Sequence, residues 1–297
     1  MAVQQTRDSL RGGHMPPRTQ PTARRRRLGA ELRRMREAAG MTAREAAELI
    51  GTNPIQMSHM EAGKAGVSEA RLRRMASQYA CLDDALVDAL AAMAGERGGG
   101  WWEEYRGTLS HGALDLAELE HFAARMRTLQ AAYVPGLLQT ERYIRGLQSY
   151  RLPKPPESHS EALTAFRRRR AEVLDRESPP RFEAVIHESA LRTRVADRAT
   201  AREQLIYLLE QSERPNVDVR VIPFAADGFG GSGDSMLYAD GPVSKLDTVQ
   251  IDALHGLFLL DAESQLVRYR ALFKKAVTFS LGIDESRDFI KRVAEEL

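Results

Sequence analysis

The sequence has a single cysteine, Cys81, among 297 residues. One thiol excludes an internal disulfide and a cysteine-based zinc site, so a reducing cytoplasm is the expected setting. Aromatic residues make up only 6%, and no apolar run approaches the roughly 20 residues of a membrane-spanning helix. The arginine-rich start also lacks the apolar core of a signal peptide. These absences predict a cytoplasmic protein that does not cross a membrane.

Sequence patterns for catalysis are scarce as well. The histidines form no HExxH or HxH pattern, and the glycine-rich run 228–233 lacks the Gly-Lys-Ser/Thr of a phosphate-binding loop. That run is expected to be a flexible loop between strands. An enzyme would have to be built around His187, Glu188 and Arg192, for which a polar strand end is the alternative interpretation. The sequence therefore predicts no catalytic residue, no metal and no cofactor.

The charge of the chain is unevenly distributed. Residues 1–80 contain 15 Lys and Arg against 7 Asp and Glu, which is a net charge of +8. Because the whole chain carries +2, the remainder carries −6. A basic head on an acidic body suggests that only the head faces a polyanion.

Three short helices separated by glycine turns are predicted near the start of the chain. The first covers 24–39, where apolar residues recur at three- and four-residue intervals. Thr42 and Glu45 have the spacing of a capping box, which predicts the start of the second helix. Thr52 or Asn53 caps the third, which has a proline in its first turn, and its methionines face inward. Its uncharged polar side chains are thereby left on the outside.

Further helices are expected over 68–79 and 82–94, followed by a glycine linker at 98–100. Beyond it, strands are predicted over 125–133, 182–187, 217–224, 235–238 and 247–251. Helices are predicted over 139–149, 159–176, 198–213, 262–276 and 284–296. The expected fold class is α+β overall, with a disordered arm over 1–23, an all-α domain over 24–97 and a mixed α+β domain over 98–297.

The string TAREAAELIGTNPIQMSHMEAG, which starts at Thr42, resembles the Xre/Cro/C1-type helix-turn-helix regulators. The shared pattern has an alanine in the second helix, a turn glycine, an inward aliphatic residue and a Glu-x-Gly end; these are Ala47, Gly51, Met57 and residues 61–63. The resemblance implies that the third helix enters the major groove of double-stranded DNA. It also implies a structural ion pair between Arg36 and Glu61.

Residues that would face DNA follow from this resemblance and from the basic run upstream. The base-reading candidates are Pro54, Ile55, Gln56 and His59. The phosphate-binding candidates are Arg24, Arg25, Arg26, Arg27, Thr42, Ala43, Arg44, Thr52, Asn53 and Lys64. Gln56 suits bidentate pairing with adenine, and Ile55 suits contact with a thymine methyl. His59 has the chemistry to read guanine or to touch phosphate, and a plain surface histidine is the alternative.

A second motif, YVPGLLQT, begins at Tyr133 and predicts a buried corner between a strand and a helix. It resembles the VPGLLQTxxY motif of the uncharacterised C-terminal domain found behind Xre-type heads in WhiJ-like, antitoxin-like actinobacterial regulators. Segments 166–170, 188–191 and 216–224 also match. This resemblance implies gene regulation, often beside a small partner protein encoded nearby.

The predicted function is a sequence-specific transcriptional regulator, a repressor that binds DNA as a homodimer. Its C-terminal domain would dimerise, sense a ligand or bind a small partner protein. The alternative is an antitoxin-like interaction protein whose body mainly clamps such a partner. The four arginines at 167–170 have the charge to bind an anion or more DNA, and a solvated helix face is the other interpretation.

Overall fold

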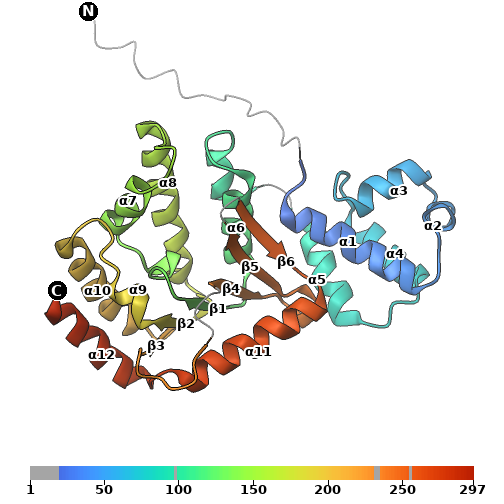
Figure 1. The fold of residues 1–297 in the computed structure, drawn as a ribbon. Coiled ribbons are helices and arrows are strands. Elements are labelled where there is room, and N and C mark those ends of the chain that lie inside the picture. The colour runs from blue at the N-terminus through green and yellow to red at the C-terminus, as the bar shows by residue number, and fades with distance from the viewer. Residues whose placement is uncertain (1–19, 97–98, 231–234, 254–255) are drawn as a thin grey trace, which may run out of the picture. The chain divides into compact units, whose positions relative to one another are not determined.

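The computed structural model describes residues 20–96, 99–230, 235–253 and 256–297 (Figure 1). The chain divides into two compact units, Met1–Ala80 and Cys81–Leu297. The described part of the first unit is helical, and the second carries a six-stranded sheet with helices. The α+β class expected from the sequence is therefore confirmed. Most of the arm expected over 1–23 lies outside the described residues.

Local hydrogen bonds start the helices of the first unit, which are α1 (Ala23–Ala38), α2 (Ala43–Leu49), α3 (Pro54–Glu61) and α4 (Glu69–Gln78). Thr22 accepts from the Arg25 amide, so α1 begins one residue before its predicted start. Thr42 and Glu45 form the predicted capping box of α2. The turns after α1 and α2 place Gly40 and Gly51 at φ of +71° and +70°, a region that favours glycine.

The core of the first unit requires small residues where helices approach closely. Ala46 and Ala47 of α2 are fully buried, as is Met57 of α3. Gly29 lies on α1 where a Cβ atom would be only 2.5 Å from the carbonyl oxygen of Glu61. The backbone of α1 therefore touches the end of α3, and a side chain at Gly29 would push the two helices apart.

The second unit contains α5 (Asp84–Gly95), α6 (His111–Phe122), α7 (Glu141–Ser149), α8 (Glu157–Ala171), α9 (Glu188–Arg192), α10 (Arg198–Ser212), α11 (Glu263–Phe279) and α12 (Ile283–Glu296). Its strands are β1 (Arg125–Gln130), β2 (Arg181–His187), β3 (Val217–Ile222), β4 (Met236–Asp240), β5 (Thr248–Ala253) and β6 (Gly256–Leu260). Single 3-10 turns are η1 (Trp101–Tyr105), η2 (Gly136–Leu138), η3 (Glu172–Leu174) and η4 (Ser244–Leu246). The sequence predicted α5 with the head, whereas the division after Ala80 groups it with this unit.

The sheet has the strand order β3-β2-β1-β4-β5-β6. Strands β1, β2 and β3 are parallel, and the pairs β1–β4, β4–β5 and β5–β6 are antiparallel. Strand β5 therefore runs in the direction of β1, and the carboxyl ends of β1, β2, β3 and β5 meet at one edge. In the register, Thr128 pairs with Leu237 and Leu237 pairs with Gln250, so these three side chains share one face.

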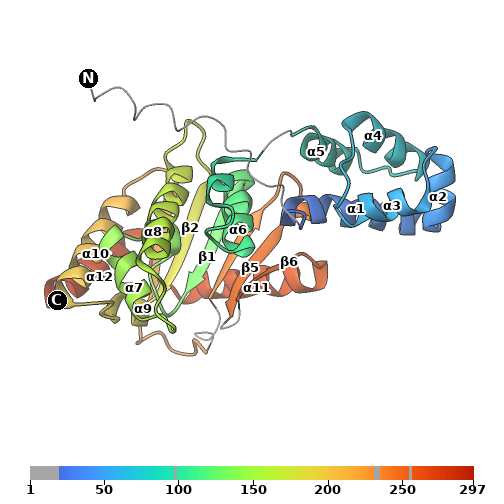
Figure 2. The same ribbon diagram turned by 90° about the horizontal axis from the view of Figure 1, so that it is seen from above.

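Helices cover both faces of the sheet. Leu237 and Met126 belong to a core with residues of α6, α7, α10 and α12. Leu129 and Tyr238 belong to the opposite core, with Leu266 and Phe273 of α11. Figure 2 shows α11 on the side of the strands opposite to α6, α7 and α8.

Three helices or strands of the second unit were not predicted from the sequence: α6, α9 and β6. Strand β1 also ends at Gln130, three residues earlier than predicted. Beyond that point, side chains rather than a neighbouring strand bond the backbone of Val134. The Val134 amide donates to the Tyr143 hydroxyl (3.3 Å), and the Gln139 side chain donates to the Val134 carbonyl (2.7 Å). The predicted glycine-rich loop falls between β3 and β4, and its residues 231–233 lie outside the described chain.

Candidate functional site

Helix α3 of the first unit has a buried side and an exposed side. Met57 and Met60 are 0% and 1% exposed, and they anchor the helix to the core. Ile55 is 70% exposed, His59 is exposed and Gln56 is half-buried. Position 59 is four residues from 55 and three from 56, so these side chains share one face of the helix. Such a face is what a helix needs to reach base edges.

The start of α3 is also open to solvent. Pro54 is exposed in the first turn, and the Asn53 side chain accepts a hydrogen bond from the Gln56 amide at 2.8 Å. The Thr52 amide donates to the Ala47 carbonyl at 2.8 Å, which closes the turn after α2. Because Pro54 has no N–H and the Gln56 amide is already bonded to Asn53, this helix start attracts phosphate mainly through its dipole.

The phosphate-binding candidates have different surroundings. Arg25, Arg26, Thr42, Asn53 and Lys64 are exposed, whereas Arg24, Ala43 and Thr52 are half-buried. Arg44 is exposed and pairs with Glu48 at 3.2 Å.

Arg27 differs from the other three arginines of the basic run. It is 8% exposed and donates to Glu31 at 2.8 Å. Burial and pairing remove Arg27 from the set that could contact phosphate, because position 27 falls on the core side of α1. The prediction for this residue is corrected accordingly.

An ion pair joins α1 to α3. Arg36 donates from Nε to Oε1 of Glu61 at 2.6 Å and from Nη2 to Oε2 at 3.0 Å. Its Nη1 donates to the Met41 carbonyl at 2.5 Å. Both side chains of the pair are only 8% exposed, and the hydrogen bond with Glu61 raises the pKa of Arg36. This bidentate geometry fixes the end of α3 relative to α1.

Tyr79, which the sequence did not single out, lies close to this pair. Its hydroxyl is buried without a hydrogen-bond partner among the described residues. Burial and the charge of Glu61 raise the pKa of Tyr79. Residue spacing in the sequence could have indicated that Tyr79 is buried. Leu72, Met75 and Tyr79 recur every three or four residues along the buried side of α4 and its cap.

His187, Glu188 and Arg192 lie at and just after the end of β2, and their side chains are hydrogen-bonded to other groups of the second unit. Glu188 accepts from the Phe224 amide at 2.7 Å and from Arg192 at 2.5 Å. The His187 Nδ1 lies 2.7 Å from the Ser189 hydroxyl, and the imidazole ring stacks on Phe229. Burial lowers the pKa of His187.

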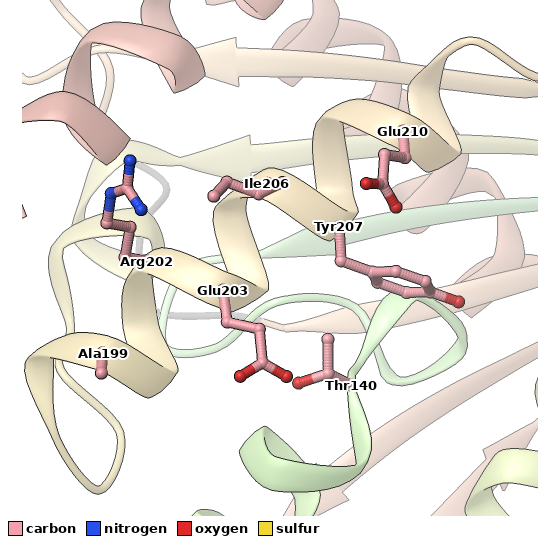
Figure 3. A pocket seen from close by; sticks show the side chains of 7 residues that line it. All are labelled: Thr140, Ala199, Arg202, Glu203, Ile206, Tyr207 and Glu210. Carbon is pink, nitrogen blue, oxygen red and sulfur yellow. The ribbon is translucent and has the colours of Figure 1, made fainter.

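A shallow pocket of about 370 Å³ lies on α10 of the second unit (Figure 3). It is lined by Thr140, Ala199, Arg202, Glu203, Ile206, Tyr207 and Glu210. Figure 3 shows the Glu203 side chain pointing toward Thr140. Gln204 holds this loop in place, since it accepts from the Thr140 amide at 2.8 Å and donates to the Leu138 carbonyl at 2.7 Å. The pocket offers mixed charge and a single aromatic ring.

None of the described helices has the length and apolar character that a membrane crossing requires. In the part of the chain that the structure describes, no three His, Cys, Asp or Glu side chains are grouped as metal ligands.

Comparison with known families gives two matches. Residues 27–90 match the model of a helix-turn-helix domain, which indicates a DNA-binding regulator. Residues 113–292, more than half of the chain, match a domain of unknown function (DUF5753). No curated protein and no solved structure matches the chain. The chain therefore belongs to the DUF5753 family, with a helix-turn-helix domain preceding the family domain.

Proposed function

We propose that this protein is a sequence-specific transcriptional regulator of the Xre type, and that α3 reads bases in the major groove. The observation that carries the proposal is the two-sided character of α3. Ile55, Gln56 and His59 are available on one side, while Met57 and Met60 fix the other side to the core. A face of free side chains on a rigid helix is the arrangement that direct readout requires.

Phosphate contacts would position this helix on the duplex. The exposed Arg25, Arg26 and Lys64 supply positive charge, and the exposed start of α3 supplies the positive end of the helix dipole. Arg24, Thr42, Ala43, Arg44, Thr52 and Asn53 complete the proposed set. Because such contacts release counterions, binding would weaken steeply as salt increases.

The second unit would control the head as a repressor of the WhiJ-like kind, working in the cytoplasm. It would pair two copies of the chain and sense a ligand or a small partner protein. Two paired heads would occupy half-sites about 34–36 Å apart, which is one turn of the duplex. Copurification of a short, separately encoded protein would assign the second unit to partner binding.

Selection of bound fragments from a random DNA pool tests the proposal directly. We expect the full-length protein to enrich one sequence, and a palindrome would reveal the pairing of two copies. Gln56→Ala and His59→Ala should each reduce discrimination against mismatched sites by about 1–3 kcal/mol. Arg26→Ala should instead weaken all sequences alike and reduce the salt dependence by about one counterion.

Arg73→Ala is a matched control, because Arg73 is an exposed arginine of the same unit that lies on α4 rather than near α3. It should leave both affinity and sequence preference unchanged. An unchanged footprint in the Gln56→Ala/His59→Ala double variant, with the fold intact, would show that α3 is not the reading helix.

A further inference from the structure

The four consecutive arginines of α8 have four different environments. Arg168 is exposed and donates to Glu141 at 2.9 Å, and Arg169 donates to Glu104 at 2.6 Å while its guanidinium lies 4.8 Å from the Trp101 ring centroid. Arg170 makes a bidentate pair with Glu120 of α6, at 2.7 and 2.5 Å. Each of these three guanidinium groups has a carboxylate partner.

Arg167 is the exception. Its side chain is half-buried, and its hydrogen bond goes to the neutral amide oxygen of Gln139, at 3.1 Å. Among the residues that the structure describes, no carboxylate lies within ion-pair distance of Arg167. Burial, Arg170 and Arg151 lower the pKa of Arg167 to about 10. A guanidinium that loses water without gaining a counter-charge destabilises the folded chain unless something else supplies one.

A second unsatisfied group points to the same region. Gln250 of β5 is 6% exposed, and its Nε2 has no hydrogen-bond acceptor among the described residues. Gln250 pairs with Leu237, so it lies on the face of the sheet whose core includes residues of α6. Asp252 follows on the same face about 7 Å further along the strand. The charge of Asp252 raises the pKa of both Arg167 and Arg170, so its carboxylate lies within electrostatic range of both guanidinium groups.

The surrounding elements give this region a defined position. The Arg170–Glu120 pair joins α8 to α6, and Gln139 follows η2 at the end of β1. Figure 2 shows α6 and α8 next to one another in front of the strands. Gln250 lies on the face of the sheet that α6 covers, so the region lies over this face.

We propose that Arg167, Arg170 and the Gln250 amide form a binding site for an oxyanion, the carboxylate or phosphate group of a small molecule. Arg167 supplies two parallel N–H donors, which match the geometry of either group. Gln250 supplies a neutral donor that is already desolvated. Arg151 and Arg170 act on Arg167 as like charges, and Asp252 and Glu120 act on it as opposite charges. These five groups carry a net charge of +1, which one negative charge on the ligand balances.

This site would be the effector site of the proposed regulator, and its link to DNA release rests on that proposed function. Binding itself does not, because every residue involved belongs to the second unit. The test therefore measures binding first. Full-length protein is titrated by calorimetry with inorganic phosphate and with succinate, each against sodium chloride at equal ionic strength. We expect one of the two probes to bind saturably and to raise the Tm.

Variants identify the site. Arg167→Met and Gln250→Leu should each weaken the binding probe by about tenfold or more, the loss expected when a charge-assisted or buried hydrogen bond is removed. Arg168→Met, one residue along α8, is the matched control and should bind normally. In chloride buffer, Arg167→Met should keep or raise the Tm, because it removes an uncompensated buried charge.

Three results would overturn the proposal: no saturable binding of either probe, equal binding by Arg167→Met, or a marked fall in the Tm of Arg167→Met in chloride. The last would make Arg167 a structural residue. Binding of a probe by a protein that selects no DNA sequence would leave the site standing and reject the regulator function alone. Preference for phosphate or for succinate tells which oxyanion the site takes.

Discussion

Arg36 in the first unit and Arg167 in the second are both arginines withdrawn from water, and they differ in what replaces the water. Arg36 has a bidentate carboxylate in Glu61 and a backbone carbonyl in Met41. Arg167 has a single amide oxygen. Their pKa values move in opposite directions, raised for Arg36 by Glu61 and lowered for Arg167 by burial. The Arg36 guanidinium is therefore bonded to a carboxylate of the protein, whereas the Arg167 guanidinium is bonded to a neutral group.

Breaking the Arg36–Glu61 pair should produce the largest effect. Glu61→Ala leaves the Arg36 charge buried and unpaired, which typically costs about 3–5 kcal/mol. The loss should appear as faster hydrogen exchange of the α3 amides in the full-length protein, because α3 is held to α1 at this point. DNA binding should weaken with it.

Glu69→Ala provides the control, since Glu69 pairs with Arg73 on the exposed side of α4, where the two side chains are 54% and 46% exposed. An exposed pair of this kind is worth only about 0–1 kcal/mol. Equal effects of the two substitutions would mean that burial does not distinguish the pairs.

The first unit could be predicted closely because its determinants are local. Thr42 and Glu45 are three residues apart, Gly51 marks its own turn, and Met57 and Met60 define one side of a single helix. Even Arg27 deviates for a local reason, because helical periodicity turns it to the core beside Glu31. The family pattern added the Arg36–Glu61 pair, which spacing along one helix does not reveal.

The second unit shows where prediction from sequence stops. Most strands and helices could be predicted from alternation and periodicity, and β6 was missed because its five residues, GLFLL, do not alternate. The candidate oxyanion site draws on residues as distant as Glu120 and Gln250. Their proximity depends on strand order and register, which the sequence alone does not determine. The sequence likewise gives no reason to expect different partners for Arg167 and Arg168, which are adjacent in α8.

Substitutions of Arg170 and Arg167 should have different effects on stability, although both residues lie in α8. Arg170→Met leaves Glu120, whose side chain is 3% exposed, without its partner, and the expected cost is again about 3–5 kcal/mol. Arg167→Met should cost nothing in the absence of an oxyanion. Both chain tryptophans report on this region, since Trp101 and Trp102 pack in a cluster with Phe166 of α8. Urea unfolding followed by their fluorescence should separate the two variants, and identical midpoints would contradict the contrast.

His187 should give the smallest effect, and it tests whether another partly buried group of the second unit is also desolvated without full compensation. Its ring lies against Phe224 and Phe229, and burial lowers its pKa below the ordinary value of about 6.5. The unfolded chain therefore takes up a proton at higher pH than the folded chain does. The contribution of neutral His187 to the free energy of unfolding is fully present above about pH 6.5, and it decreases as the pH falls through the pKa of the unfolded chain.

His187→Gln should reduce this dependence of stability on pH, measured as the urea midpoint of tryptophan fluorescence between neutral and mildly acidic pH. Parallel pH profiles for the two proteins would show that His187 is as well solvated when folded as when unfolded.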